Sequence, residues 1–165
     1  MYLKKIIHSA TIILLLCLFS QSHASALATA GWAEKATLFP QGISFNAKLD
    51  TGAETTSINA INPEFFERDG KQWTRFKITN KQNKTATIEA PVVREATIKR
   101  HFGKQQVRPV IMLDICVGNV RKTVEVNLID RSRLDYQLLI GRNFLKGSFL
   151  IDSGSTYMLS PDCPD

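Results

Sequence analysis

The sequence predicts one mostly β domain that follows an N-terminal export signal, and three observations lead to this expectation. The composition is that of an ordinary globular protein, with 165 residues, 44% hydrophobic residues, 22% charged residues and three cysteines. It excludes disulfide-dense miniproteins, collagen-like chains and disordered acidic tails. From Gly42 onward, short β-type runs alternate with turn residues, and no helical periodicity is sustained. The first two dozen residues have the pattern of a targeting segment.

The targeting segment begins with a basic start, Lys4 and Lys5, continues with an apolar run over residues 6–19, and ends in small residues. This order is typical of a secretory signal peptide, and the run is short for a membrane span. We expect cleavage near Ala24, with Ala30 as a second candidate and an uncleaved anchor as the alternative. The mature protein is therefore expected in the periplasm or secreted, without a stable membrane span.

The expected organisation has three parts: a signal peptide over residues 1–24, a loosely held lead-in over residues 25–41, and one domain over residues 42–160. Loss of Lys4 and Lys5 with the signal lowers the formal net charge from +6 to +4. The sequence has no long block of basic residues, so a nucleic-acid partner is not expected.

Strand, turn and helix signals follow one another along the domain. Expected strands are 43–50, 73–79, 86–93, 96–100, 106–117, 120–129, 136–140, 148–153 and 156–159. Expected turns are 69–70, 80–84, 103–104 and 118–119. Gly118 and Asn119 suit a two-residue hairpin, because both tolerate the positive φ that such turns need. Short helices are expected at 63–68, with Pro63 in the first position, and at 142–146 before Gly147.

Cys116 and Cys163 are the two cysteines that follow the signal segment. In an oxidising compartment they could form a disulfide. Cys116 also lies within an apolar run, where a buried free thiol is an equally good interpretation. The sequence leaves both alternatives open.

Two segments carry the residues with the clearest chemical meaning. In the first, residues 47–58, a β-type run leads directly into Asp-Thr-Gly-Ala at 50–53. Gly52 allows a close backbone approach, so that N–H groups of the turn can bind a carboxylate. In the second, residues 138–145, an apolar strand ends at Gly141 and turns into a short helix.

Together the two segments resemble the retropepsin-type aspartic peptidases, whose signature pairs Asp-Thr-Gly-Ala with a later apolar-apolar-Gly-Arg-Asn segment. Residues 108–111, 126–131 and 149–152 are similar to the bacterial branch of that clan, which has carried the label ATP-dependent zinc protease. That branch includes relatives encoded beside ATP-grasp peptide ligases. The resemblance covers residues 42–159 and implies a closed β-barrel with a short helix after the Gly-Arg-Asn segment.

The zinc and ATP parts of that label find no support in the residues. Zinc needs three or four His, Cys, Asp or Glu ligands in a tight cluster, whereas the chain after the signal has one histidine, His101. A P-loop ends in Gly-Lys-Ser/Thr, but within residues 141–147 the lysine precedes the glycine. A Ser–His hydrolase of the Gly-x-Ser-x-Gly type lacks its elbow. We therefore expect no metal and no cofactor.

The resemblance implies a specific chemical role for Asp50. An aspartic peptidase needs two carboxylates that share one proton, because like charges about 3 Å apart are costly to ionise together. One carboxylate activates the attacking water, and its protonated partner polarises the scissile carbonyl. With a single Asp-Thr-Gly, the resemblance implies a homodimer in which two Asp50 side chains meet on the two-fold axis. By the resemblance, Thr51 forms a hydrogen bond across that axis and Gly52 lines the substrate cleft. Ala53 belongs to the same loop and supports the site.

Glu54, Arg142 and Asn143 are expected to support the site and the dimer. By the resemblance, Glu54 occupies the position where viral relatives have an Asp paired with the arginine of the Gly-Arg-Asn segment. We therefore expect a Glu54–Arg142 ion pair at the base of the dimer. The bacterial branch often has a basic residue at this position, and the alternative for both residues is an ordinary surface charge.

A second candidate carboxylate, Asp152, begins an Asp-Ser-Gly triplet at 152–154 that suggests a monomer in which Asp152 acts with Asp50. The triplet follows the only closing Gly-Arg segment, whereas a two-lobed peptidase needs such a segment after each Asp. We therefore expect the triplet to be a turn between the last two strands.

The expected function is that of an exported aspartic endopeptidase acting as a homodimer on peptides, proteins or peptide-like tails made by a ligase. A flap that closes over the substrate is expected at residues 77–90 or 94–104. The alternative is a catalytically idle relative that keeps the barrel as a binding or assembly module.

Overall fold

The backbone is almost entirely β-structured in this computed structural model, which describes residues 27–98 and 105–164. The strands are β1 (Ala28–Phe39), β2 (Ile43–Leu49), β3 (Thr56–Asn59), β4 (Glu64–Arg68), β5 (Lys71–Thr79), β6 (Thr85–Pro91), β7 (Arg94–Ile98), β8 (Gln106–Val117), β9 (Val120–Ile129), β10 (Leu138–Ile140) and β11 (Phe149–Thr156). One short helix, α2 (Arg142–Leu145), follows β10. The expected signal peptide and the expected turn at 103–104 lie outside the described residues.

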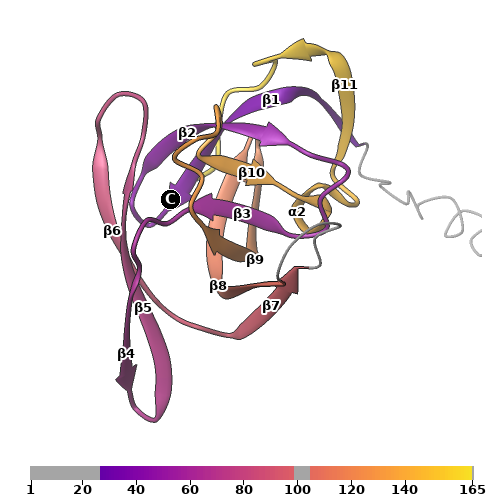
Figure 1. The fold of residues 1–165 in the computed structure, drawn as a ribbon. Coiled ribbons are helices and arrows are strands. Elements are labelled where there is room, and N and C mark those ends of the chain that lie inside the picture. Colours follow the sequence, from indigo (N-terminus) through magenta and orange to yellow (C-terminus); the bar gives the residue numbers. More distant parts are fainter. Residues whose placement is uncertain (1–26, 99–104, 165) are drawn as a thin grey trace, which may run out of the picture.

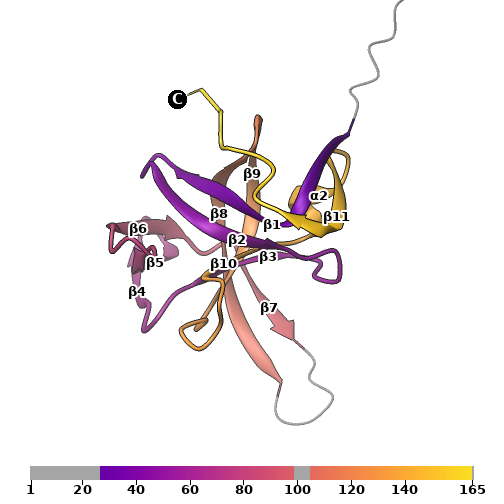
Figure 2. The same cartoon turned by 90° about the horizontal axis from the view of Figure 1, so that it is seen from above.

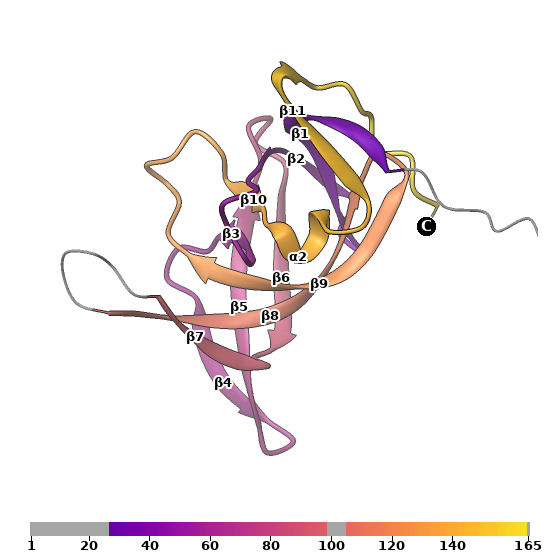
Figure 3. The same ribbon diagram turned by 90° about the vertical axis from the view of Figure 1, so that its right-hand side faces the viewer.

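Six of the strands close into a barrel (Figures 1 and 3). Neighbouring strands pair in the order β1-β2-β10-β3-β9-β8, and β8 pairs back onto β1. Outside this ring, β11 pairs with β1 and β7 pairs with β8. The predicted closed β-barrel with a short helix after the Gly-Arg-Asn segment is therefore confirmed. No helix in the described part of the chain is long and apolar enough to cross a membrane.

Side-chain alternation explains why these runs form barrel strands. In β2, the side chains of Ile43, Phe45, Ala47 and Leu49 are buried, and the residues between them point outward. The barrel interior is thus filled by apolar side chains. Asp50, the candidate carboxylate, follows Leu49 directly, where the strand ends.

Tight turns join several neighbouring strands as the sequence predicts. Val117 pairs with Val120, so Gly118 and Asn119 form a two-residue hairpin loop in which Gly118 has φ +56°. The turn at residues 69–70 joins β4 to β5, and both of its residues have positive φ. Both turn predictions are confirmed.

Strands β4, β5 and β6 form a separate three-stranded sheet, the accessory sheet, which projects beside the barrel (Figure 1). The helix predicted at 63–68 is wrong, because β4 occupies this segment. Phe66 lies opposite Trp73 in the register, and the two rings stack with their centroids 6.5 Å apart. The guanidinium of Arg68 lies 4.5 Å above the Trp73 ring. These cross-strand contacts override the local capping signal.

The two segments expected to hold the flap fall in different sheets. Residues 77–90 lie mainly in the β5–β6 hairpin of the accessory sheet. Residues 94–98 form β7, which pairs with β8 and projects from the barrel (Figure 2). The remainder of that second segment lies beyond the residues that the structure describes.

Residues 28–39 form β1, a barrel strand, instead of the loosely held lead-in predicted over 25–41. The side chains of Ala30, Ala33 and Ala36 are fully buried. Alanine is depleted in strands and gives a weak apolar signal, so the alternation in this run is hard to recognise from sequence. The folded domain therefore includes β1 and starts well before residue 42.

The C-terminal segment contains one strand, β11, where two strands were predicted at 148–153 and 156–159. The register against β1 shifts within β11: Gly31 pairs with Asp152, and Ala33 pairs with Thr156. The shift marks a bulge or a similar irregularity in β11. The predicted turn between two strands is therefore wrong, and Asp152 lies at an irregularity within a single strand.

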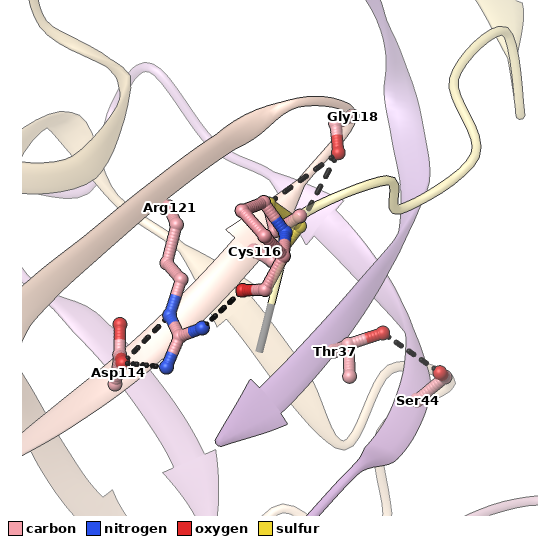
Figure 4. The surroundings of a disulfide bond; sticks show 8 residues. Thr37, Ser44, Asp114, Cys116, Gly118 and Arg121 are labelled. Carbon is pink, nitrogen blue, oxygen red and sulfur yellow. Dashed lines mark hydrogen bonds and ion pairs between the residues drawn. A yellow bond between two sulfur atoms is a disulfide. The ribbon is translucent and has the colours of Figure 1, made fainter. Parts of the chain in front are cut away.

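A disulfide joins Cys116 to Cys163 (Figure 4), and it decides between the two alternatives that the sequence left open. It connects residues 47 positions apart, at the end of β8 and in the C-terminal tail. The double variant Cys116→Ser/Cys163→Ser is expected to lose about 2–4 kcal/mol of unfolding free energy, because the bond restricts the unfolded chain. Urea denaturation measures this loss, and the reduced wild type should match the variant. An unchanged midpoint would contradict the prediction.

Candidate active site

The two sequence motifs lie side by side at one end of the barrel. β10 pairs with β2 in parallel, so that Ile140 lies opposite Leu49. The two strands end together, and the backbone N–H of Asp50 donates to the Ile140 carbonyl at 2.9 Å. Asp50 and Gly141 therefore leave the sheet next to each other.

The Asp50 carboxylate is held in place and remains accessible. Its Oδ1 accepts a hydrogen bond from the Gly52 N–H at 2.9 Å, and the Ala53 N–H donates to the Asp50 carbonyl at 3.2 Å. The Lys48 ammonium lies 3.9 Å from Oδ2, and 29% of the Asp50 side chain is exposed. The loop thus presents a carboxylate that is fixed by a backbone donor and open to water and substrate.

The first residues of α2 bind the Asp50 loop through their backbone. The N–H groups of Arg142 and Asn143 donate to the carbonyls of Ala53 and Glu54, at 2.8 and 3.0 Å. These N–H groups have no partner within so short a helix, and the loop carbonyls satisfy them. The two motifs therefore fold as one interlocked unit.

The Arg142 side chain also binds the loop backbone, and it does not pair with Glu54. Its Nη1 donates to the two carbonyls of residues 51–52, at 3.0 and 2.9 Å. The predicted Glu54–Arg142 ion pair does not form within this chain, because these carbonyls bind the guanidinium. The pKa of Arg94 is raised mainly by its hydrogen bonds to Glu125, with smaller contributions from the charges of Glu125 and Glu54.

Asn143 connects three elements below the site. Its Oδ1 accepts hydrogen bonds from the Thr56 N–H and Oγ1, at 3.0 and 2.8 Å. Its Nδ2 donates to the Glu125 carbonyl at 2.8 Å. The Thr56 hydroxyl in turn accepts from the Gly141 N–H at 3.1 Å. Thr56 is fully buried, so Asn143 satisfies polar groups that water cannot reach. No sequence signal had indicated Thr56.

Comparison with known proteins agrees with this geometry. A family model described as "Retropepsin-like aspartic endopeptidase RimB" matches residues 29–161. The chain belongs to the RimB-like family. A crystal structure of the Legionella pneumophila protein Lpg0085, of unknown function, matches with a TM-score of 0.68 and 34% identity. The match covers 81% of this chain and 98% of that one.

Curated relatives of the RimB-like domain are named as ligases. A probable alpha-L-glutamate ligase from Shewanella pealeana is 34% identical over 116 residues, and one from Parasynechococcus marenigrum is 29% identical over the same length. Each match covers 68% of this chain and 25% of the relative. The chain therefore spans about a quarter of the length of the curated relatives it matches.

A hollow of about 410 Å³ in the RimB-like domain opens beside Asp50. It is lined by Trp32, Lys48, Arg131, Leu134, Asp135, Tyr136 and Leu139. Because Lys48 also lies 3.9 Å from the Asp50 carboxylate, the hollow is adjacent to the candidate catalytic group. The rings of Trp32 and Tyr136 meet edge to face with centroids 5.9 Å apart. We call this hollow the Asp50 pocket.

Arg131 is a buried cation in the wall of the Asp50 pocket, with 8% of the residue exposed. Its Nε donates to the Tyr136 carbonyl at 2.9 Å, and its Nη1 donates to Ser57 Oγ at 3.1 Å. Burial lowers its pKa first, the Arg108 charge lowers it further, and the Asp50 charge opposes both. Within residues 27–98 and 105–164, no carboxylate forms an ion pair with Arg131. The sequence analysis noted the segment 126–131 as similar to the bacterial branch but assigned Arg131 no role, because its burial is not visible in the sequence.

A second hollow, of about 420 Å³, borders the Asp50 loop of the RimB-like domain at Thr51. It is lined by Thr51, Arg142, Leu145, Lys146, Phe149, Leu150 and Ile151. Its lining is largely apolar, and Leu150 is 56% exposed. The neighbouring strand β11 is the edge of its sheet. We call this surface the β11 face.

Asp152 is engaged in its own loop of the RimB-like domain and does not pair with Asp50. Its Oδ2 accepts from Ser155 Oγ at 2.6 Å, and its Oδ1 accepts from the Gly154 N–H at 2.8 Å. Both hydrogen bonds lower the pKa of Asp152, and the bond from Ser155 has the larger effect. In the sheet, β1 separates β11 from β2. Asp152 is therefore engaged by its own strand, and that strand is not adjacent to the one that leads to Asp50.

No group of three or more His, Cys, Asp or Glu side chains could hold a metal ion among the residues that the structure describes. His101, the histidine considered above, lies outside them.

Proposed function

We propose that this protein is an exported aspartic endopeptidase that works as a homodimer, with one Asp50 contributed by each protomer. The observation that carries the proposal is the partly exposed Asp50 carboxylate, which is bound by the Gly52 N–H in a loop whose backbone interlocks with the Gly-Arg-Asn segment. Membership of the RimB-like family supports it.

The proposed reaction is the hydrolysis of an amide bond by a water molecule. One Asp50 takes a proton from the water, and the water oxygen attacks the scissile carbonyl carbon. The second Asp50, which is protonated, donates to the carbonyl oxygen as negative charge develops there. A proton then passes to the amide nitrogen, the C–N bond breaks, and a carboxylic acid and an amine are released.

The β11 face supports the dimer, because it offers an apolar surface beside the catalytic loop. Thr51 and Arg142 border this surface, and Leu150 is exposed on it. An exposed apolar patch next to an unpaired strand edge is typical of a protein–protein contact. A second copy docked there would bring the two Asp50 loops toward a common axis.

The Asp50 pocket supports a substrate with an acidic side chain next to the scissile bond. Arg131 is buried without a carboxylate partner among the described residues, and a lone buried charge is costly. A substrate carboxylate between Lys48 and Arg131 would supply the missing partner. The name of the curated relatives, probable alpha-L-glutamate ligase, is in keeping with a glutamate-bearing substrate.

Export is supported by the signal pattern at the N-terminus and by the Cys116–Cys163 disulfide, since disulfides persist in oxidising compartments. N-terminal sequencing of the protein from a periplasmic fraction is expected to give a chain that starts at Ser25. A chain that starts at Met1 in the cytoplasmic fraction would contradict export.

A peptide library that includes acidic sequences tests the proposed activity. We expect cleavage at internal amide bonds that is unaffected by a strong chelator. The matched control is the Asp50→Asn protein under the same conditions. No cleavage by a dimeric wild-type protein would favour the idle binding module.

Replacing Arg131 tests the proposed substrate class. For a peptide with Glu beside the cleaved bond, Arg131→Met should lower kcat/KM by about 10- to 100-fold, the value of one charged hydrogen bond. The matched Gln peptide should be affected much less. Arg133→Met, which removes a nearby exposed charge outside the pocket, is the control variant. Equal losses for the Glu and Gln peptides would contradict the acidic preference.

A further inference from the structure

The C-terminal tail after β11 folds back over β1, and we call residues 157–164 the strap. Tyr157 reverses the chain with a positive φ of 53°. Its N–H donates to the Ala33 carbonyl at 2.8 Å. The strap has no helix or strand of its own. It is held by hydrogen bonds to the barrel, by the packing of Leu159 against the core and by a disulfide.

The strap is bound at its near end by Glu34, a carboxylate with no exposed surface. Glu34 Oε1 accepts from the Met158 N–H at 3.0 Å, and Oε2 accepts from the Leu159 N–H at 3.0 Å. Oε1 also accepts from the Gly31 N–H at 2.7 Å. One buried carboxylate thus ties the strap to both ends of a four-residue stretch of β1, and it is compensated only while these donors are in place.

The strap is bound at its far end by the disulfide. Cys163 is bonded to the fully buried Cys116 (Figure 4). The Asp162 N–H donates to the Gly118 carbonyl at 2.7 Å, and Arg121 donates to the Pro164 carbonyl. The disulfide is the only covalent tie among these contacts. Without it, the strap is held only by hydrogen bonds at Glu34, Gly118 and Arg121 and by the packing of Leu159, and a segment with so few ties opens locally more easily.

Trp32 lies in β1 between Gly31 and Glu34, the residue that binds the strap. Gly31 donates to Glu34, and Trp32 stands between them in the sequence with its side chain in the wall of the Asp50 pocket. Trp32 also faces the bulge of β11, where the register shifts between Gly31 and Ala33. The strap therefore binds Glu34, Glu34 binds Gly31, and Gly31 directly precedes Trp32 of the pocket wall in the chain.

We propose that the Cys116–Cys163 disulfide is a redox-sensitive latch that holds the strap on Glu34 and thereby holds Trp32 in the wall of the Asp50 pocket. When the disulfide is reduced, the strap detaches, Glu34 becomes hydrated, and the Trp32 wall loosens. The inference rests on the proposed function in that the pocket is taken to receive the substrate. The movement of Trp32 itself does not depend on peptidase activity.

The opening step is a two-electron thiol–disulfide exchange with a dithiol reductant. One thiolate of the reductant attacks a sulfur of the disulfide and forms a mixed disulfide, and its second thiolate then releases the protein. The protein gains two electrons and two protons as two thiols, and the reductant becomes a cyclic disulfide. Cys163 is the more accessible of the two sulfurs, since Cys116 is fully buried.

Tryptophan fluorescence tests the latch directly, because the sequence has only two tryptophans, Trp32 and Trp73. The Trp73→Phe variant leaves Trp32 as the sole reporter. On reduction with dithiothreitol, we expect its emission to shift to longer wavelength and its quenching by acrylamide to increase, while the far-UV circular dichroism is unchanged. Amide hydrogen exchange at Met158 and Leu159 should accelerate in the same samples.

The matched control is Trp32→Phe, whose sole reporter Trp73 lies in the accessory sheet, where reduction should change nothing. In the Trp73→Phe background, Cys163→Ser should show the shifted emission without reductant and no response to it. Glu34→Gln should shift the emission while the disulfide is intact. Thiol titration shows when the disulfide has been reduced. If the Trp32 emission is unchanged at that point, the latch is overturned. A simultaneous change in both reporters with loss of circular dichroism would also overturn it.

Peptidase activity provides a second readout, which would not respond to reduction if the disulfide had only a structural role. If reduction leaves about a tenth of the molecules with a formed pocket wall, KM should rise about tenfold with little change in kcat. A Trp32 response without any peptidase activity would refute the proposed function and leave the latch standing. Activity that is unaffected by reduction, despite a Trp32 response, would refute the link from latch to substrate.

Discussion

Asparagine in place of Asp50 should abolish peptide cleavage, with kcat reduced by about 10⁴-fold. Asn has nearly the same shape, and its side-chain oxygen can still accept from the Gly52 N–H, so the loop should keep its geometry. It cannot accept or hold the proton that the reaction transfers. In a homodimer the substitution removes both carboxylates at once. Cleavage of a labelled peptide by the two proteins at equal concentration measures the effect.

Asp152→Asn is the matched control for this substitution. Asp152 is bound by Ser155 and Gly154 within its own bulge, so its loss should leave kcat within about twofold of the wild type and should affect stability at most modestly. Equal loss of activity in the two variants would favour a monomeric site formed by Asp50 and Asp152. Cleavage by the Asp50→Asn protein would contradict the aspartic peptidase mechanism.

A single methyl group at Gly141 should separate the two motifs. A Cβ at this position would lie 2.7 Å from the Thr55 carbonyl carbon and 2.9 Å from the Thr56 nitrogen. The backbone itself permits alanine, since Gly141 has φ −92° and ψ 178°, so the cost is purely steric. We expect Gly141→Ala to lose about 2–3 kcal/mol of unfolding free energy. Cleavage should also fall, because the Asp50 loop rests on this junction.

Gly154→Ala is the control for Gly141→Ala. Its Cβ would have only the Asp152 Oδ1 nearby, at 3.4 Å, which is an ordinary contact. The unfolding free energy should change by no more than about 0.5 kcal/mol. Urea denaturation of both variants measures the difference. Similar midpoints for Gly141→Ala and the wild type would show that the motifs are not rigidly interlocked.

Much of the barrel is predictable from sequence, because its strands have large apolar side chains at alternate positions. β2, with Ile43, Phe45 and Leu49 directed inward, is such a case. β1 escapes recognition, since small alanines fill its inward positions where strands cross closely. β4 is also missed, because its strand form depends on pairing with β5, which lies later in the chain.

The residues of the candidate site also differ in how far the sequence predicts them. Asp50 and Gly141 can be predicted, because each belongs to a short motif whose backbone geometry is local. Arg131 and Glu34 cannot, since their importance comes from burial and from partners far away in the sequence. A lone charged residue reads as a surface charge until the fold encloses it. The pocket wall and the strap therefore required the structure.

The most direct test of the proposed dyad is the specific activity of the wild-type protein as a function of its concentration, with sedimentation velocity on the same samples. The dimer account predicts that activity per chain rises with concentration and follows the dimer fraction. It also predicts that added Asp50→Asn chains lower this activity by forming mixed dimers. Constant activity per chain in samples that sediment as monomers would contradict the account.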